Sequence, residues 1–180
     1  ANLLYRLPQQ HVDWRGIETG VPYGIWRSVG YSYNTFAIEC FIDELAEAAG
    51  VDALDYRRQL LAGSPRLLGC LERVAQMSGW NAHRSRGRAL GLAVCACFGS
   101  FIAVVAELVV HHGAPPKVSR IWCAVDCGIA VMPDTVVAQI EGGVVFALSA
   151  ALFGKIHFVD GAVAEGNFDR YRLLRIDETP

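Results

Sequence analysis

An amide side chain in an apolar run is the first feature of this sequence that could support chemistry. Gln139 lies within the mostly apolar stretch from Pro133 to Phe153, which also contains the pair Gly142-Gly143. An amide donates and accepts hydrogen bonds at once, and glycine lets a neighbouring backbone or a ligand approach closely. Together they would suit a polar ligand held close to the helix backbone. The alternative is a glutamine whose hydrogen bonds are satisfied inside a pair of helices.

A second feature is the dense segment Gly-Ile-Trp-Arg-Ser-Val-Gly from Gly24 to Gly30. The guanidinium of Arg27, or the N–H groups of this segment, could stabilise negative charge that builds up on an oxygen during a reaction. The alternative is a surface arginine that packs on Trp26. Both interpretations stay open on these residues alone.

The six cysteines do not form a pattern typical of a disulfide framework or of a zinc site. Most of them lie in apolar runs, where a free cysteine behaves as a small hydrophobic residue. They are Cys40, Cys70, Cys95, Cys97, Cys123 and Cys127. Neither short interval among them is the two-residue spacing of a zinc knuckle, so we predict no metal ligands. A redox switch that uses Cys123 and Cys127 is a weaker alternative.

Composition favours a folded domain and disfavours two classes of partner. The chain has 180 residues, of which 53% are hydrophobic, so it can bury a core. The formal net charge is -2, which gives no field that would attract nucleic acid. The basic run from His83 to Arg88 is short, and we interpret it as a solvated loop. We therefore predict that nucleic acid is not a partner.

The chain first shows loops and then three helices. Residues 1–33 are rich in Pro, Gly, Trp and Tyr without a helical period, which indicates loops and extended segments. The first helix should begin with Asn34 as its N-cap and end at Gly50. The second should run from the Asp52 cap to Gly63, and the third from Ser64-Pro65 to Gly79.

The second half has β character. The uncharged stretch 89–106 is long enough for a membrane helix, but its glycines and its Val, Ile and Phe residues favour strands near 89–98 and 100–111, with a third at 118–125. We predict no membrane insertion. The run from Pro133 to Phe153 should form a long buried helix, and Asp160-Gly161 should turn a hairpin.

These elements predict an α+β fold. In it, N-terminal loops and three helices precede a mixed β-sheet with one long buried helix and a hairpin. The character of the sequence changes near residue 88, so we divide the chain into a loop and helical segment, 1–88, and an α+β segment, 89–180.

Two stretches resemble the xanthine dehydrogenase superfamily, and within it the isoquinoline 1-oxidoreductase and aldehyde dehydrogenase branch. The first, Gly24 to Ala46, begins with Gly-Ile-Trp-Arg-Ser-Val-Gly and continues to Cys-Phe-Ile-Asp-Glu-Leu-Ala. The second, Cys123 to Ala151, contains Val-Asp-Cys-Gly and Gln-Ile-Glu-Gly-Gly-Val-Val. The resemblance implies that the chain is a C-terminal piece of a large subunit that binds molybdenum-molybdopterin, and that both segments named above belong to that subunit.

The resemblance also implies roles for single residues. Gln139 matches a glutamine that hydrogen-bonds the cofactor near the molybdenum, and Arg27 lies in the loop that passes the metal's ligands, where it would be catalytic. Val29 stands where xanthine-type enzymes carry a substrate-stacking aromatic ring, which implies a different substrate pocket. Glu141 would belong to the helix framework. The other implied cofactor-binding residues are Trp26, Ser28, Gly30, Gly142 and Gly143.

Departures from the family pattern bear on activity. Met132 replaces a usual asparagine, and Cys95-Ala96-Cys97 replaces a more polar triplet. The family's catalytic glutamate, in a Gly-Glu-Pro motif, and its glycine-rich cofactor loops have no counterpart in these 180 residues. We therefore expect the chain to have no turnover by itself.

For a complete enzyme, the resemblance implies hydroxylation of an aldehyde or of an N-heteroaromatic carbon. The implied partners are the remainder of the large subunit and an iron–sulfur subunit that receives the electrons, and a homo-oligomer is a further option. Family members occur in the cytoplasm and in the periplasm, so the sequence names no compartment. The alternative function is a non-catalytic assembly or dimerisation module whose apolar strands pair with another chain.

Overall fold

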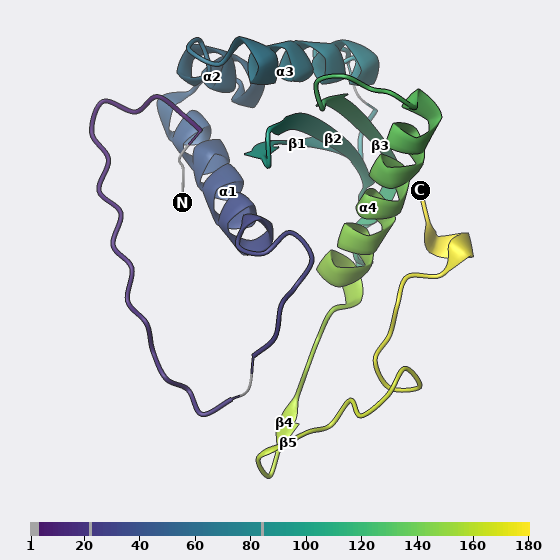
Figure 1. Cartoon of the computed structure of the whole chain (residues 1–180). Coiled ribbons are helices and arrows are strands. Elements are labelled where there is room, and N and C mark those ends of the chain that lie inside the picture. Colours follow the sequence, from purple (N-terminus) through teal and green to yellow (C-terminus); the bar gives the residue numbers. More distant parts are fainter. Residues whose placement is uncertain (1–3, 22, 84) are drawn as a thin grey trace. The chain divides into compact units, whose positions relative to one another are not determined.

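The structure is a computed structural model that describes residues 4–21, 23–83 and 85–180. The chain divides into two compact units, Ala1–Gly128 and Ile129–Pro180, and each is described by itself below (Figure 1). Arg84 of the predicted basic loop lies outside the described residues. The division into segments 1–88 and 89–180 stays a prediction, and in the structure the third helix of the first segment packs on strands of the second.

The first unit has three helices followed by a three-stranded sheet. The helices are α1 (Tyr31–Ala49), α2 (Ala53–Leu60) and α3 (Pro65–Ser78), and the strands are β1 (Arg88–Cys97), β2 (Ser100–Val109) and β3 (Lys117–Asp126). The strand order is β1-β2-β3, so β1 and β3 are the edges of this sheet. Helix α3 packs on β2 and β3, and α1 packs on β1.

Capping residues set most helix ends where the sequence predicted them. The Asp52 side chain accepts the N–H groups of Leu54 and Asp55 and so begins α2. Gly50 and Gly79 end α1 and α3 in the left-handed conformation. The prediction that Asn34 caps the first helix is wrong, because α1 begins one turn earlier, with Gly30 as its N-cap.

The stretch that raised the question of a membrane helix forms β1 and β2, as predicted. Phe98 and Gly99 connect the two strands in a tight turn in which both residues have positive φ, 49° and 80°. Both strand pairings are antiparallel. The predicted mixture of strand directions is therefore wrong, because connections as short as these cannot make the crossover that a parallel pair requires.

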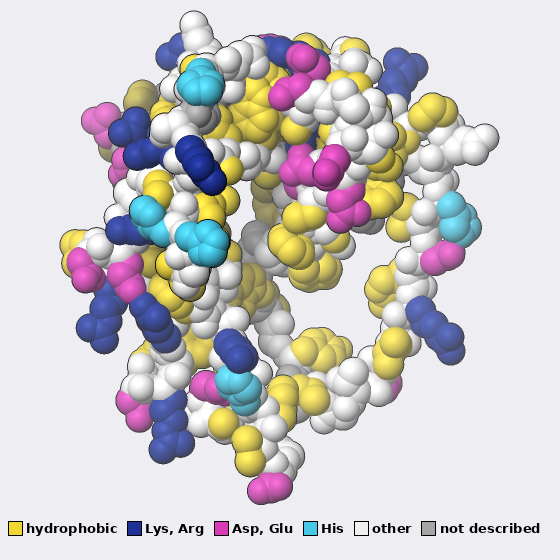
Figure 2. Space-filling view, turned by 180° about the vertical axis from the view of Figure 1, so that it is seen from behind, with side chains coloured by type: hydrophobic (Ala, Val, Ile, Leu, Met, Phe, Trp, Pro, Cys, Tyr) yellow, Lys and Arg dark blue, Asp and Glu magenta, His cyan; other side chains and the backbone are white. Residues whose placement is uncertain are grey.

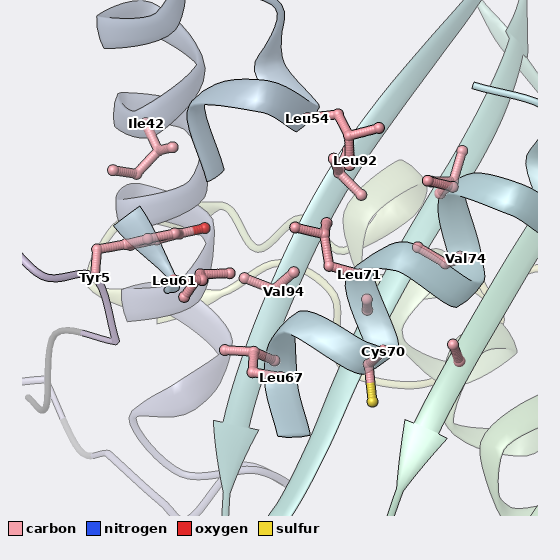
Figure 3. Packing of buried hydrophobic residues seen from close by; sticks show 14 residues of the cluster. Tyr5, Ile42, Leu54, Leu61, Leu67, Cys70, Leu71, Val74, Leu92 and Val94 are labelled. Carbon is pink, nitrogen blue, oxygen red and sulfur yellow. The ribbon is translucent and has the colours of Figure 1, made fainter. Parts of the chain in front are cut away.

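The core of this unit lies between the helices and one face of the sheet. Leu67, Leu71 and Val74 of α3 are fully buried and belong to one hydrophobic cluster with Leu92 and Val94 of β1 (Figure 3). Alternate residues of β1 and β2 point to this face, as expected for strands with one covered side. The helix layer therefore fixes where β1 lies, and with it the pocket described below.

The second unit contains α4 (Pro133–Phe153), the short strands β4 (Phe158–Val159) and β5 (Ala162–Val163), and the 3₁₀ turn η1 (Ile176–Glu178). The predicted hairpin is confirmed: β4 pairs with β5 through Asp160 and Gly161, which both have positive φ. Pro133 begins α4 and Gly154 ends it, also as predicted. The α+β class is thus confirmed.

The predicted burial of α4 is not found within the second unit. This unit buries none of the residues of α4, because it supplies only a two-stranded hairpin and one turn as cover. With a mean hydropathy of 1.8, α4 is long and apolar enough to cross a membrane by length and composition alone. The core helix of a soluble protein satisfies the same criterion, so the predicted lack of membrane insertion stays a prediction.

Candidate functional site

The turn that leads into α1 has an unusual backbone. The N–H of Val29 donates to the Trp26 carbonyl at 3.0 Å, and the N–H of Tyr31 donates to the Ser28 carbonyl at 3.0 Å. Ser28 and Val29 have positive φ, 74° and 51°, although neither is glycine. Such conformations cost roughly 1–3 kcal/mol each and occur preferentially at functional sites. The strained turn coincides with the segment that the sequence predicted to be functional.

A pocket of about 290 Å³ lies between the first turns of α1 and strand β1. It lies entirely within the first unit. Its walls are mainly apolar, with a few polar groups, which is typical of sites for small molecules. The pocket is lined by Leu4, Val29, Gly30, Tyr31, Asn34, Thr35, Ile38, Glu39, Val94, Cys95, Ala96 and Phe98.

Glu39 is the buried carboxyl group of this pocket and is only 5% exposed. It accepts three kinds of donor: the Tyr5 hydroxyl at 2.7 Å, the Arg57 Nε–H at 3.1 Å and the Val94 backbone N–H at 3.0 Å. Burial raises the pKa of the Glu39 carboxyl, and the charge of Arg57 and the three hydrogen bonds counteract that rise. The carboxyl group is thus satisfied by protein donors and joins four segments of the chain.

Arg57 is fully buried and completes this network. Its guanidinium also donates to the Asp43 carboxylate at 2.5 Å and to the carbonyls of Glu39 and Ala53 at 3.1 and 3.2 Å. These partners compensate the buried charge of Arg57 for the loss of water. Removing one of them would leave that charge partly unpaired and lower the stability of the fold. The sequence analysis missed this network. Its one signal was that Arg57 lies at helical spacing between Leu54 and Leu61, which are both buried.

The cysteines show no sign of redox or metal chemistry. All six are free, and burial raises the pKa of the Cys70, Cys95 and Cys123 thiols. A raised pKa disfavours the reactive thiolate of Cys123, and the redox alternative for Cys123 and Cys127 stays a prediction. Within residues 4–21, 23–83 and 85–180, no group of three His, Cys, Asp or Glu side chains could hold a metal ion.

In the second unit, α4 carries an exposed amide side chain next to two glycines, which have no side chains. Gln139 is exposed, and Gly142 and Gly143 follow three and four residues later on the same side of the helix. A Cβ atom added at either glycine would meet nothing within 4 Å in the described chain. Each glycine costs a helix about 1 kcal/mol relative to alanine, and no neighbour among the described residues of the second unit explains that cost. This face therefore fits close approach by a flat polar cofactor or by another backbone.

The structure thus groups the predicted site residues in two places. Val29 and Gly30 line the pocket, and Trp26, Arg27 and Ser28 form the exposed turn beside them. Gln139, Gly142 and Gly143 share a face of α4. Their roles in binding and catalysis remain predictions.

Charge is distributed without a dominant sign. On the face shown in Figure 2, Lys and Arg side chains are interspersed with Asp and Glu side chains. The mixed charges on this face agree with the formal net charge of -2, and the prediction that nucleic acid is not a partner stays a prediction.

Comparisons with known proteins identify the family. The molybdopterin cofactor-binding domain family matches residues 73–180. The isoquinoline 1-oxidoreductase β subunit of Brevundimonas diminuta is 35% identical over 98% of this chain, which covers 23% of that protein. A nicotinate dehydrogenase subunit of Pseudomonas putida is 31% identical over 86% of the chain, covering 14% of that relative. A membrane-bound aldehyde dehydrogenase of Gluconacetobacter polyoxogenes is 28% identical over 87% of the chain, covering 23% of that enzyme.

The chain spans less than a quarter of the length of these curated relatives. No solved structure matches it. The family match nevertheless includes more than half of the chain and all of α4 with Gln139. The chain therefore belongs to the molybdopterin cofactor-binding family of oxidoreductase large subunits.

Proposed function

We propose that this chain works as part of the large subunit of a molybdenum hydroxylase that oxidises an aldehyde or an N-heteroaromatic compound. The observation that carries the proposal is the exposed Gln139 beside Gly142-Gly143 on α4, inside the region that matches the cofactor-binding family. The names of the relatives, which refer to isoquinoline, nicotinate and aldehyde, support these two substrate classes.

The bound molybdenum-molybdopterin would supply the redox centre at which the substrate carbon is oxidised. Gln139 would hold the cofactor through its amide, which donates from nitrogen and accepts at oxygen. Gly142 and Gly143 would let the flat ligand lie close to the helix, since no side chain projects there. The turn at Trp26, Ser28 and Gly30 would contribute backbone contacts, also to the cofactor.

Arg27 would act on the reacting group. Its permanently charged guanidinium could stabilise negative charge on a substrate oxygen, a contribution that is largest where water is excluded. Val29, which lines the pocket, would contact the substrate and, being smaller than an aromatic residue, would leave room for it. No metal ligand is assigned to this chain.

The chain by itself should have no turnover. Catalysis of this kind requires a base near the substrate, and the carboxyl group in the pocket, Glu39, already accepts hydrogen bonds from Tyr5, Arg57 and Val94. We expect the purified 180-residue chain with added molybdenum cofactor to oxidise neither isoquinoline nor an aromatic aldehyde. Measurable turnover would contradict this part of the proposal.

The proposed partners are the remainder of the large subunit, an iron–sulfur subunit and a possible second copy of the protein. Two relatives are named as subunits, which supports the need for other chains. The small share of each relative that the chain covers is consistent with a larger functional unit.

A chimera would test the assignment. The matching segment of the Brevundimonas isoquinoline 1-oxidoreductase β subunit is replaced by this chain, and molybdenum content and isoquinoline oxidation are measured. We expect both to be retained, and Gln139→Leu to lower both. Gln59→Leu, an exposed glutamine in α2, is the matched control and should change neither. A folded chimera that contains no molybdenum, or equal molybdenum in both variants, would count against the proposal.

The second candidate function is a non-catalytic assembly or dimerisation module. One observation favours it: α4 is apolar, and the second unit buries none of its residues. Exposed apolar surface of this extent is typical of interaction sites. Light scattering on the purified chain decides, because this alternative requires a stable oligomer and a clean monomer argues against it.

A further inference from the structure

The pocket beside α1 opens on the free edge of a β-strand. Among the residues that the structure describes, strand β1 pairs only with β2. The Val94 N–H points away from β2, since it donates to Glu39 at 3.0 Å. Backbone groups of a strand alternate in direction, so those of Ala96 face the same free edge. Ala96 lines the pocket, and no hydrogen-bond partner of its N–H is found among the described residues. The pocket therefore contains a backbone donor that is ready for a ligand.

The walls of the pocket suit a flat molecule. Val29 and Ile38 provide aliphatic surface from the α1 side, and Val94 provides it from the β1 side. The rings of Tyr31 and Phe98 stand edge to face at 5.4 Å and provide aromatic surface. A volume of about 290 Å³ accommodates one small ring system.

The charge of the pocket limits the ligand further. No Lys or Arg is among its lining residues in the described chain. Glu39 is the one lining carboxyl group, and its oxygens are already engaged by Tyr5, Arg57 and Val94. Arg27, in the exposed turn beside the pocket, is not among the lining residues of the described chain. An anionic ligand inside the pocket would therefore be desolvated without a counter-charge in direct contact with it, which is costly. A neutral hydrogen-bond acceptor loses much less solvation free energy, because one N–H group can replace its hydrogen bond to water.

We propose that this pocket binds an uncharged planar molecule with one hydrogen-bond acceptor, a ring nitrogen or a carbonyl oxygen, which receives the Ala96 N–H. The pocket discriminates against planar molecules that carry a carboxylate. The identification of this ligand as the substrate rests on the proposed function, whereas the binding preference rests on the pocket alone. An N-heteroaromatic ring and an aromatic aldehyde both satisfy this description, and nicotinate does not.

Titration of the 180-residue chain tests the preference, with amide NMR as the readout at a pH near 7.5, where isoquinoline is uncharged. Isoquinoline should shift the Ala96, Val94 and Tyr31 amide signals. Nicotinate should bind about tenfold more weakly or worse, and naphthalene, which lacks the acceptor, about fivefold more weakly, in line with one lost hydrogen bond. Absence of isoquinoline binding, equal affinity for nicotinate, or shifts confined to other parts of the chain would overturn the proposal.

Two variants and one control locate the binding. Val29→Trp should fill the pocket and weaken isoquinoline binding about tenfold or more, and Phe98→Ala should weaken it by removing an aromatic wall. Val12→Trp is the matched control, because Val12 is 59% exposed and Val29 is 60% exposed, and it should leave the affinity unchanged. Unchanged affinity in folded Phe98→Ala and Val29→Trp would contradict the assignment.

The experiment also separates this inference from the proposed function. If isoquinoline binds as expected but the chimera contains no molybdenum, the pocket assignment stands and the proposed function fails. If the chimera is active but the chain prefers nicotinate or binds nothing, only the pocket assignment fails.

Discussion

The carboxylate of Glu39 accepts the backbone N–H of Val94 at 3.0 Å and so ties the middle of α1 to the free edge of β1. The same carboxylate binds Tyr5 and the fully buried Arg57. One side chain thus holds an N-terminal segment, two helices and a strand together. Because α1 begins directly after the strained Ser28-Val29 turn, this network also fixes the position of that turn beside the pocket.

Replacement of Glu39 should therefore destabilise the first unit strongly. In Glu39→Leu, Arg57 would keep Asp43 but lose its buried partner, and we expect a loss of about 3 kcal/mol in the free energy of unfolding. The measurement is chemical denaturation followed by circular dichroism. Glu44→Leu, an exposed position in the same helix, should change stability by less than about 0.5 kcal/mol. Similar losses in the two variants would mean that the network is not a main source of stability.

A second carboxylate should make stability depend on pH. Asp126 accepts two hydrogen bonds from the Arg66 guanidinium, at 2.8 and 2.6 Å, and one from the Gly128 N–H at 2.9 Å. The Arg66 hydrogen bonds, and then that of Gly128, hold the pKa of Asp126 well below its usual value of 3.8. A lowered pKa means that the folded state binds the proton less readily than the unfolded state. The stabilisation is thus complete above the unfolded pKa and is lost as the pH falls below it.

The corresponding experiment compares melting temperatures of the unchanged chain and Asp126→Asn between pH 2 and pH 7. The unchanged chain should be more stable above about pH 5, and the difference should shrink steadily toward pH 2. Other carboxylates titrate in both proteins and cancel in the comparison. A difference that does not vary with pH would show that Asp126 stabilises the fold by some other means than its charge.

Relief of the strained turn should stabilise the first unit. Val29 has a φ of 51°, a conformation that glycine adopts without steric cost and a β-branched residue does not. We therefore expect the free energy of unfolding of Val29→Gly to be about 1 kcal/mol higher than that of Val12→Gly. The Val12→Gly control increases the conformational entropy of the unfolded chain by the same amount but relieves no backbone strain. Thermal denaturation of both variants provides the comparison. A Val29→Gly variant no more stable than its control would remove the argument that strain is stored at this turn.

Local signals in the sequence predicted most of the secondary structure. The Asp52 cap, the Gly79 stop and the Asp160-Gly161 turn each act within a few residues, so their effects can be read without knowledge of the tertiary fold. The beginning of α1 was predicted one turn too late because the tight turn at Ser28 and Val29, both of which are unusual residues for positive φ, carries no sequence signature.

Features that depend on contacts between distant segments could not be predicted. The Glu39 network joins residues 5, 39, 57 and 94, and no periodicity connects positions so far apart. Burial of α4 was predicted from its apolar composition, but composition shows only that a helix requires cover, not which part of the protein supplies it, and the second unit by itself does not. Gln139 and Val29 were identified as site residues through a family resemblance, and the pocket that contains Val29 was found only in the structure.

The glycine pair of α4 should respond to substitution in opposite ways in two settings. In the chain alone, Gly142→Ala and Gly143→Ala should each stabilise the helix by about 1 kcal/mol, because alanine is the better helix former and an added Cβ meets nothing within 4 Å. In the chimeric subunit described above, the same methyl groups should obstruct the cofactor or the neighbouring backbone and lower the molybdenum content. Gly69→Ala in α3, where an added Cβ is also unobstructed, should stabilise both proteins and leave molybdenum unchanged. If all three variants behave like Gly69→Ala, the glycine pair serves no approach by a ligand or partner, and the main structural support for a cofactor on α4 is lost.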